Sequence, residues 1–349
     1  MASKSNVYAG VAGYVGRADQ KGSVGVFARQ ADSGRWEHVV KDIETYTVNI
    51  HPTNPNVVFA GTADGVYRST DRGKSFQRTN FPGTRQIWSF LVDANDRNSI
   101  YAGASPIGMY RSGDCGETWR ELPNPGMPDR AVMPFACRVM RMAQQPNKPG
   151  TIFAALEVNG VMKTTDGGES WTDCSTDLIR LAQQPHLKSK IVSDTYNEGM
   201  LDGHAIAISP ADPDKAILAV RMGLFETEDG GQTWRDMELG RFSPTTYGRD
   251  IKVSPRDGNT LYAALSVAAA SKDGAIYRST DKGASWTRFD KVQVHGTIMS
   301  VALHQTDPDQ VYIGARYDGE IYGTEDGGAT WDSLPLPSGV KDIYSVAVG

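Results

Sequence analysis

The stretch Tyr67-Arg68-Ser69-Thr70-Asp71-Arg72-Gly73-Lys74-Ser75-Phe76 decides the fold, because its pattern returns five more times along the chain. Each copy has an aromatic or apolar residue, a polar segment with Ser or Thr, an Asp-x-Gly, and then Ser or Thr before an aromatic residue. The other copies run from Tyr110 to Trp119, Met162 to Trp171, Phe225 to Trp234, Tyr277 to Trp286 and Tyr322 to Trp331. The pattern predicts two strands joined by a tight turn, in which the aspartate accepts hydrogen bonds from turn N–H groups and the glycine permits a positive φ. We therefore expect the six aspartates to be structural and to lie away from any functional site.

These repeats resemble the Asp-box, or bacterial neuraminidase repeat, which is written Ser-x-Asp-x-Gly-x-Thr-Trp. The family includes sialidases, xyloglucan hydrolases, the sortilin ectodomain and photosystem II assembly factors. In all of them the box closes a hairpin in a β-propeller blade. The resemblance implies the fold but does not choose a function, because the family spans enzymes, receptors and chaperones.

A second recurring sequence pattern precedes each box. It consists of a short apolar strand, a turn with Pro, Asn or Asp, and a strand ending in small residues, as in Val48 to Gly61. Each unit therefore has four strands, and such units bury both faces by stacking radially. Six units are complete. The segment Ile343 to Val348 matches a first strand and Asn6 to Gly10 a second strand, so the two ends of the chain are expected to share a seventh blade.

The sequence thus predicts an all-β fold: a seven-bladed β-propeller of four-stranded antiparallel blades, closed by strands from both ends of the chain. We expect one domain over residues 1–349. The expected blades are residues 341–349 with 6–40, then 42–80, 84–122, 135–174, 203–238, 247–289 and 295–333.

Composition limits the classes of partner. The net charge of −5 gives no basic footprint for nucleic acid or an anionic membrane. No apolar run approaches the roughly 20 residues that span a bilayer, and the N-terminus lacks the apolar segment of a signal peptide. The three cysteines, Cys115, Cys137 and Cys174, are an odd and scattered set that fits reduced thiols. A cytoplasmic location is expected, although a leader removed before this N-terminus would leave the same sequence.

Long connections are expected on the face where the first strands of the blades begin. They are roughly Asp173 to Gly203, Leu122 to Ala136 and Glu238 to Arg249. Insertions gathered on one face mark the binding side of a repeat protein.

An alignment of the first strands on their buried apolar residues places seven side chains at one position near the channel mouth: Tyr46, Trp88, Arg138, His204, Arg249, Met299 and Tyr344. Trp88 is unusual, because the other six tryptophans lie in the last strand of a blade. It is either a packing residue between blades or a stacking platform for a sugar or another planar ligand.

Four arginines are expected around the same opening, because Arg221 and Arg316 end second strands on the face that holds Arg138 and Arg249. Their forks suit a carboxylate or phosphate. The alternative is pairing with acidic neighbours such as Glu157, which is itself a candidate binding residue. Sialidases also use arginines for a carboxylate, but this chain lacks their Arg-Ile-Pro signature and has seven expected blades where sialidases have six.

His204 and His295 are the candidate acid or base groups, with Tyr46 beside them, because a histidine titrates near neutral pH. A buried histidine with satisfied hydrogen bonds is the alternative. No cofactor is expected. A divalent cation held by Glu198, Asp202, His204 and His295 is conceivable, but no spacing in the sequence supports it.

The leading interpretation is a lyase or hydrolase, including a lactone-opening enzyme, that acts on a small anionic, aromatic or sugar-acid molecule at the channel mouth. Arginines would hold the anion while Trp88 and Tyr344 stack on its body. A non-catalytic scaffold that binds a protein partner is the second interpretation. A glycoside hydrolase is the third, and it needs two carboxylates about 5 to 10 Å apart. The candidates near the mouth are Glu44, Asp202, Asp250 and Asp342.

Overall fold

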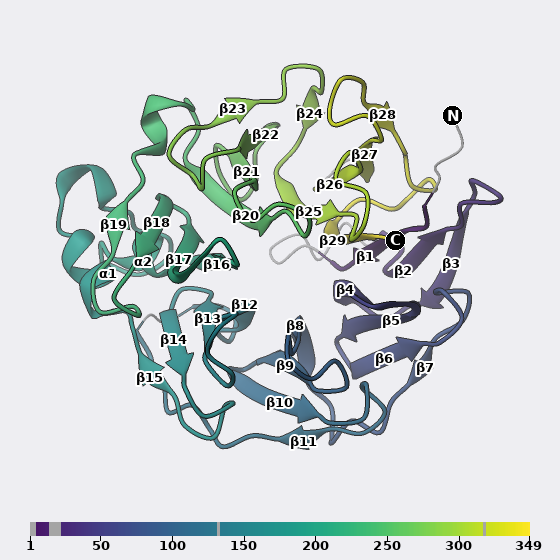
Figure 1. Cartoon of the computed structure of the whole chain (residues 1–349), viewed down its shortest axis with the longest axis horizontal. Helices are drawn as coiled ribbons and strands as arrows, with labels where there is room; N and C mark the ends of the chain where they lie inside the picture. The colour runs from purple at the N-terminus through teal and green to yellow at the C-terminus, as the bar shows by residue number, and fades with distance from the viewer. Residues whose placement is uncertain (1–4, 14–21, 131–132, 317–318) are drawn as a thin grey trace.

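The computed structural model describes residues 5–13, 22–130, 133–316 and 319–349. Its strands form seven antiparallel sheets arranged as blades around one axis (Figure 1). This confirms the all-β, seven-bladed fold predicted from the repeats.

The blades are numbered here in ring order, and each has four strands on its main path. Blade 1 contains β29 (Ile343–Val348), β1 (Val7–Val11), β2 (Gly25–Arg29) and β3 (Trp36–Lys41). Blade 2 contains β4 (Thr45–His51), β5 (Asn54–Thr62), β6 (Gly65–Ser69) and β7 (Gln77–Arg78); blade 3 contains β8 (Gln86–Val92), β9 (Ile100–Ser105), β10 (Gly108–Ser112) and β11 (Arg120–Glu121). Blade 4 contains β12 (Val139–Gln144), β13 (Ile152–Leu156), β14 (Gly160–Thr164) and β15 (Thr172–Asp173).

Blade 5 contains β16 (Gly203–Ser209), β17 (Asp212–Val220), β18 (Gly223–Thr227) and β19 (Arg235–Asp236). Blade 6 contains β20 (Tyr247–Val253), β21 (Leu261–Ser266), β22 (Asp273–Ser279) and β23 (Thr287–Arg288), with β24 (Val294–His295) paired to β22. Blade 7 contains β25 (Ile298–Leu303), β26 (Val311–Ala315), β27 (Glu320–Thr324) and β28 (Asp332–Ser333).

Short helices occupy the connections that follow blades 4 and 5. The first connection holds α1 (Thr176–Leu181), the 3-10 turn Pro185–Leu187 and α2 (Glu198–Leu201), and the second holds the 3-10 turn Leu239–Arg241. No helix in the described ranges is long and apolar enough to span a membrane.

The hydrophobic core consists of layers between blades. Seven clusters of buried residues correspond to the seven pairs of neighbouring blades. These layers form because successive side chains of a strand point to opposite faces of the sheet, so each inner strand contributes apolar residues to both of its neighbours. In β17, for example, Leu218 and Val220 pack toward blade 4 while Ile217 and Ala219 pack toward blade 6. Each blade therefore completes the core of both neighbours.

Both ends of the chain close the ring in blade 1. The C-terminal strand β29 is the innermost strand of this blade and pairs with β1 over Val7 to Val11 (Figure 1). Backbone hydrogen bonds between Asn6 and Gly349, of 3.0 and 3.1 Å, extend the ladder. The predicted closure is confirmed.

The Asp boxes are hydrogen-bonded turns between the third and fourth strands. In the box of blade 3, Asp114 accepts hydrogen bonds from the Thr118 N–H at 2.9 Å and from the Ser112 hydroxyl at 2.7 Å, while Ser112 Oγ accepts the Gly116 N–H at 2.8 Å. Gly116 has φ of 82°, as the turn requires. The other five boxes repeat these contacts.

The boxes lie on the face opposite the channel mouth. In blade 6 the box follows Ser279, which pairs with Leu261 and through it with Val253 at the end of the first strand. The mouth lies at the start of that strand, at Tyr247. This geometry agrees with a structural role for the boxes.

Removing residues 343–349 should lower the thermal unfolding temperature sharply, because blade 1 loses its innermost strand and the two adjoining core layers lose their contacts with it. Lys341→Ala is the control, since it changes an exposed side chain just outside β29 and keeps the strand. Circular dichroism melts measure both proteins. A truncated protein that melts like the full chain would contradict closure by β29.

Asp114→Ala should lower the free energy of unfolding by about 1 kcal/mol at pH 7, because turn hydrogen bonds are lost. Partial burial opposes ionisation, but the hydrogen bonds from Thr118 and Ser112 hold the pKa of Asp114 below its usual value. An aspartate with a depressed folded pKa stabilises the fold above its unfolded pKa of about 3.9, and that contribution disappears as pH falls through the folded pKa.

The difference between wild type and Asp114→Ala should therefore narrow below about pH 4, which denaturant titrations at several pH values measure. Asp290→Ala is the matched control, because this exposed carboxylate makes only a 3.8 Å contact with Arg288 among the described interactions. A constant difference from pH 7 to pH 2 would argue against the assigned role of the carboxylate.

Candidate functional site

Every first strand carries a β-bulge near the mouth end of its ladder. In each ladder one residue of the innermost strand is skipped, and the seven skipped residues are Tyr46, Trp88, Met140, His204, Arg249, Met299 and Tyr344. A bulge places two residues opposite one and re-aims a side chain. These seven bulges form one level around the channel.

The alignment from sequence identified six of these seven residues, but it was wrong in blade 4. It placed Arg138 at the common level, whereas the bulge residue is Met140 and Arg138 lies two positions earlier. The cause is that Val139 and Met140 are both apolar and buried, so the apolar pattern does not fix which residue bulges.

Bulge residues from five blades fill the channel at this level. Tyr46, Trp88, Met140, Met299 and Tyr344 pack together with Ala12, and each is at most 5% exposed. The Tyr46 ring stacks on Trp88 with 4.1 Å between centroids. This group, called the plug below, closes the channel axis.

The plug changes the expected roles of two residues. Trp88 is 3% exposed, with the Tyr46 ring against it and the Arg138 guanidinium 4.0 Å from its ring, so it offers no open face for a ligand. The Tyr46 hydroxyl donates to Glu44 at 2.7 Å, and burial, aided by Glu44, raises the pKa of Tyr46. Both are packing residues of the plug rather than a stacking platform and a proton donor.

A cavity of about 240 Å³ lies on the mouth side of the plug. Six of the predicted binding residues line it: Arg138, Glu157, Arg221, Arg249, Arg316 and Tyr344. Three of them, Glu157, Arg221 and Arg316, directly follow the second strands β13, β17 and β26. Strand ends from blades 1, 4, 5, 6 and 7 therefore converge here.

Cations outnumber anions in the cavity wall. Four arginines and two carboxylates, Glu157 and Asp202, line it, which leaves a formal excess of two positive charges. Arg138 lies 2.5 Å from Glu157, and Arg221 lies 3.5 Å from Asp202. Arg316 is 3.8 Å from Asp342 and donates a hydrogen bond to the Tyr344 hydroxyl.

Arg249 differs from the other three arginines. Within the described part of the chain it makes no hydrogen bond or ion pair, although only 8% of its surface is exposed. Burial opposes its charge, but Tyr247, Glu157 and Asp202 raise the pKa of Arg249, so it stays a cation. A buried, unpaired guanidinium at a cavity is suited to bind an anion.

His204 lies behind the cavity wall, in contact with the wall residues Asp202 and Tyr247. It is 2% exposed and does not line the wall; its Nδ1 is 2.7 Å from the Gly248 carbonyl, and its Nε2 is 3.2 Å from Asp202 and 3.3 Å from the Tyr247 hydroxyl. Asp202 and Tyr247 do line the wall. Any proton that His204 exchanges with a ligand passes through these two groups.

The pKa values of Asp202 and Tyr247 lie far apart. Burial works to raise the pKa of Asp202, but His204, Arg221 and Arg249 outweigh it and lower the pKa to about 2. Burial raises the pKa of Tyr247 to about 12. At neutral pH Asp202 is a carboxylate and Tyr247 is a neutral hydrogen-bond donor.

Two sequence-based assignments do not reach this cavity. His295 is exposed in β24, where it pairs with Asp273, and it is not part of the wall. The carboxylate of Glu198 accepts the N–H groups of Ile191, Val192 and Ser193. Over the described ranges, no group of three or more His, Cys, Asp or Glu residues is placed to hold a metal ion. The cation site considered for Glu198, Asp202, His204 and His295 therefore has no support.

Three of the candidate carboxylates are engaged elsewhere. Glu44 accepts the Gly13 N–H and the Tyr46 hydroxyl, and Asp342 lies beside Arg316. Asp250 is fully buried and accepts the N–H groups of Ile251 and Val301, away from the mouth. Of the four, only Asp202 lines the mouth cavity.

Sequence reasoning missed Tyr247 and the apolar rim. Tyr247 precedes the bulge residue Arg249 by two positions, the same offset as Asp202 before His204, and this spacing is the signal that could have found it. Met133, Phe135, Ile191 and Val192 come from the long connections, as expected for the binding face, but their composition gave no signal. The Glu198 carboxylate accepts the backbone N–H groups of Ile191 and Val192 and so fixes these two residues at the rim.

Comparisons with known proteins agree with the fold. A family model described as "Sortilin, neurotensin receptor 3" matches residues 274–347. A probable oligoxyloglucan-reducing end-specific xyloglucanase of Neosartorya fischeri is 25% identical over 222 residues, which cover 54% of this chain and 26% of that protein. The xyloglucanase Xgh74A of Acetivibrio thermocellus is 25% identical over 289 residues, covering 67% of this chain and 31% of that protein.

The chain thus spans about a quarter to a third of the length of these curated relatives. Among solved structures, a GH74 enzyme of Niastella koreensis aligns with a TM-score of 0.62 at 16% identity, over 83% of this chain and 45% of that chain. YCF48 of Cyanidioschyzon merolae aligns with a TM-score of 0.53 at 15% identity, over 85% and 86% of the two chains. Such identities show the fold alone.

The sequence relatives are hydrolases by name, whereas the structural neighbours share only the architecture. Six Asp boxes and the closed ring of seven blades give this chain the architecture of an Asp-box, or bacterial neuraminidase repeat, β-propeller, and it is similar to the proteins named above.

Proposed function

We propose that this protein is a hydrolase that binds a small anionic substrate, of the sugar-acid or lactone class, in the mouth cavity. The observation that carries the proposal is Arg249, a buried guanidinium with no partner among the described residues, in a wall with two excess positive charges. The similarity to xyloglucanases favours a hydrolase acting on a carbohydrate-like molecule.

Arg249 would anchor the anionic group of the substrate. Its planar fork can donate two parallel hydrogen bonds to a carboxylate, and the surrounding protein strengthens this attraction relative to water. A cavity of about 240 Å³ is suited to a ligand of monosaccharide size rather than a long polymer. The apolar rim of Phe135, Ile191 and Val192 would cover the body of the substrate.

The remaining groups supply acid–base chemistry for opening an ester or lactone. Tyr247 would donate its hydroxyl proton to the leaving oxygen and recover a proton from His204 behind it. Asp202, whose carboxylate lies 3.2 Å from His204 Nε2, would hold the attacking water. The attacking water would pass its proton through Asp202 to His204, which replaces the proton that reached the leaving oxygen through Tyr247, so the net reaction adds one water across the ester bond.

Arg249→Met should weaken the binding of carboxylate ligands by about 1.5 to 3 kcal/mol, the range for hydrogen bonds to charged groups. Methionine keeps the apolar stem and removes the fork. Isothermal titration calorimetry with a panel of sugar acids and aromatic acids measures the effect. Arg256→Met is the control, because Arg256 is exposed and lies outside the cavity wall. Equal affinities in the two variants would refute the anchor.

Tyr247→Phe and His204→Gln should each lower kcat by about 10²- to 10⁴-fold, the usual contribution of a positioned acid or base, with little change in KM. Because the two residues act in series, the double variant should be no slower than the worse single variant. His295→Gln should leave turnover unchanged. Additive losses in the double variant, or equal changes in KM, would mean that His204 only supports the fold.

Glycoside hydrolysis is a second candidate, because the curated relatives are xyloglucanases. It requires a pair of carboxyl groups, and Glu157 and Asp202 are the two in the described cavity wall. Asp202, with a pKa of about 2, would be the ionised partner, which leaves Glu157 as the acid. Glu157 is engaged by Arg138 at 2.5 Å, which leaves its carboxyl group less available to a substrate, so we rank this candidate second.

A screen of aryl glycosides alongside lactones separates the two reactions. Glycoside turnover that is abolished by Glu157→Gln would favour glycoside hydrolysis, whereas lactone turnover that survives this change would favour the first proposal. Tight anion binding without any turnover would leave the non-catalytic scaffold as the function.

A further inference from the structure

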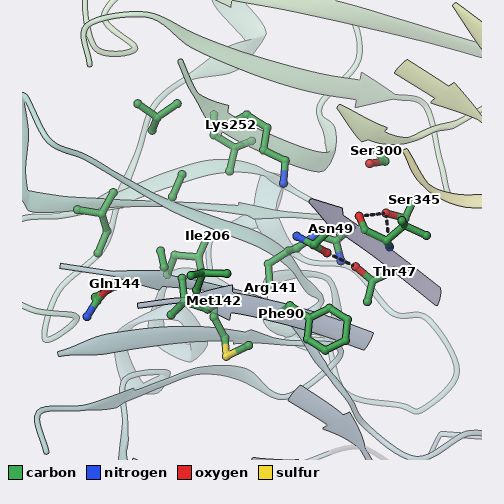
Figure 2. A pocket seen from close by; sticks show the side chains of 18 of the residues that line it. Thr47, Asn49, Phe90, Arg141, Met142, Gln144, Ile206, Lys252, Ser300 and Ser345 are labelled. Carbon is green, nitrogen blue, oxygen red and sulfur yellow. Dashed lines mark hydrogen bonds between the residues drawn. The ribbon is translucent and has the colours of Figure 1, made fainter. Parts of the chain in front are cut away.

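A second cavity lies on the other side of the plug. It measures about 320 Å³ and is lined by residues that follow the bulges in the first strands, such as Asn49, Arg141 and Lys252 (Figure 2). It shares no lining residue with the mouth cavity. The buried plug lies at the bulge level between the two sets of lining residues, so the channel has two separate chambers.

Two cations face this inner chamber. Figure 2 shows the ends of Arg141 and Lys252 directed into the same space, from β12 of blade 4 and β20 of blade 6. No carboxylate belongs to the described wall. Asp250 lies behind it, with Oδ1 at 3.6 Å from Lys252, but its oxygens already accept the Ile251 and Val301 N–H groups.

Both cations keep donor capacity for a ligand. Arg141 uses Nη1 for the carbonyls of Trp88 and Met140, at 3.3 and 2.7 Å, and among the described residues its Nε and Nη2 donate no hydrogen bond. The Thr47 hydroxyl donates to the side-chain oxygen of Asn49 at 2.9 Å, which leaves the Asn49 amide hydrogens for the chamber. The wall thus offers donors and two positive charges, with one carboxylate, that of Asp250, behind it.

Burial acts against these charges. It lowers the pKa of Arg141 and of Lys252, and Asp250 offsets only part of the effect. The two cations also repel each other, and of the two only Lys252 has a carboxylate nearby, that of Asp250 at 3.6 Å. An anion between the two cations would offset both the cost of burying their charges and their mutual repulsion.

We propose that the inner chamber is an anion site that binds a small oxyanion, such as inorganic phosphate, between Arg141 and Lys252. The oxyanion accepts the free N–H groups of Arg141, the Lys252 ammonium and the Asn49 amide. Because Arg141 and Lys252 belong to blades that are not neighbours, the bound ion connects blades 4 and 6 across the channel. It therefore stabilises the ring as well as filling a site, and it does so independently of the mouth.

The test is phosphate binding by the full chain, measured by calorimetry and by the thermal unfolding temperature in phosphate against chloride at equal ionic strength. Wild type is expected to bind phosphate and to melt at a higher temperature in it. In an Arg249→Met background, which removes anion binding at the mouth, Lys252→Met should weaken phosphate binding at least 10-fold and remove the thermal shift. Arg249→Met alone should keep the binding and the thermal shift that belong to the inner chamber, and adding Lys74→Met, which removes an exposed lysine, should leave both unchanged.

Loss of phosphate binding in Arg249→Met with retention in Lys252→Met would assign the ion to the mouth and overturn the proposal. Absence of binding and of any thermal shift in wild type would overturn it as well. If Lys252→Met fails to fold, wild-type crystals soaked in selenate give an independent answer from anomalous scattering. A selenium peak between Lys252 and Arg141 supports the site, whereas an empty chamber rejects it.

Discussion

The structure depends on the way seven first strands are joined side by side around one axis. The residue after the bulge makes many of these joints, because its side chain bonds to the backbone of the next blade. Ser345 accepts the Val48 N–H at 3.0 Å, Ser89 donates to the Val139 carbonyl at 2.8 Å, Asp250 accepts the Val301 N–H at 2.9 Å and Ser300 accepts the Val346 N–H at 3.2 Å. Because the residue after the bulge is fixed by this hydrogen bond to the next blade, the bulge residue just before it points to the axis. The size of the ring and the contents of its centre are thus set by the same short stretch of each strand.

One level of side chains divides the channel into two chemical environments. Aromatic and methionine side chains of the plug exclude water at the axis. On the mouth side, four arginines face two carboxylates, and on the inner side Arg141 and Lys252 face none in the described wall. Cations that are removed from water without a full complement of acidic partners are costly unless an anion arrives. The same physical argument therefore supports anion binding in both chambers, although acid and base groups suited to catalysis, Asp202, Tyr247 and His204, gather only at the mouth.

Much of the fold follows from local sequence, whereas the site depends on details that local sequence does not specify. The boxes are predictable because one Asp, one Ser or Thr and one Gly satisfy a turn within a few residues, and ring closure follows from a missing and a surplus strand. The bulge residues were located by aligning the seven first strands on their apolar residues. This alignment failed for Met140, because the adjacent apolar residues Val139 and Met140 fit equally well. Trp88 stood out by composition, yet its burial depends on Tyr46 and Arg138 from the neighbouring blades. Tyr247 begins β20 two positions before its bulge residue, so the strand spacing could have identified it. The position of His295 depends instead on how β24 pairs with β22 after the box of blade 6, which no repeat pattern encodes.

The central claim is that the mouth of the ring holds a small anion against Arg249. Its most direct test is a crystal structure of the protein with a brominated aromatic carboxylate, in which bromine is located by anomalous scattering. The predicted result is a bromine peak inside the mouth cavity with the carboxylate against the Arg249 guanidinium. A structure with that cavity empty, while the ligand occupies only the outer surface of the blades, would contradict the claim.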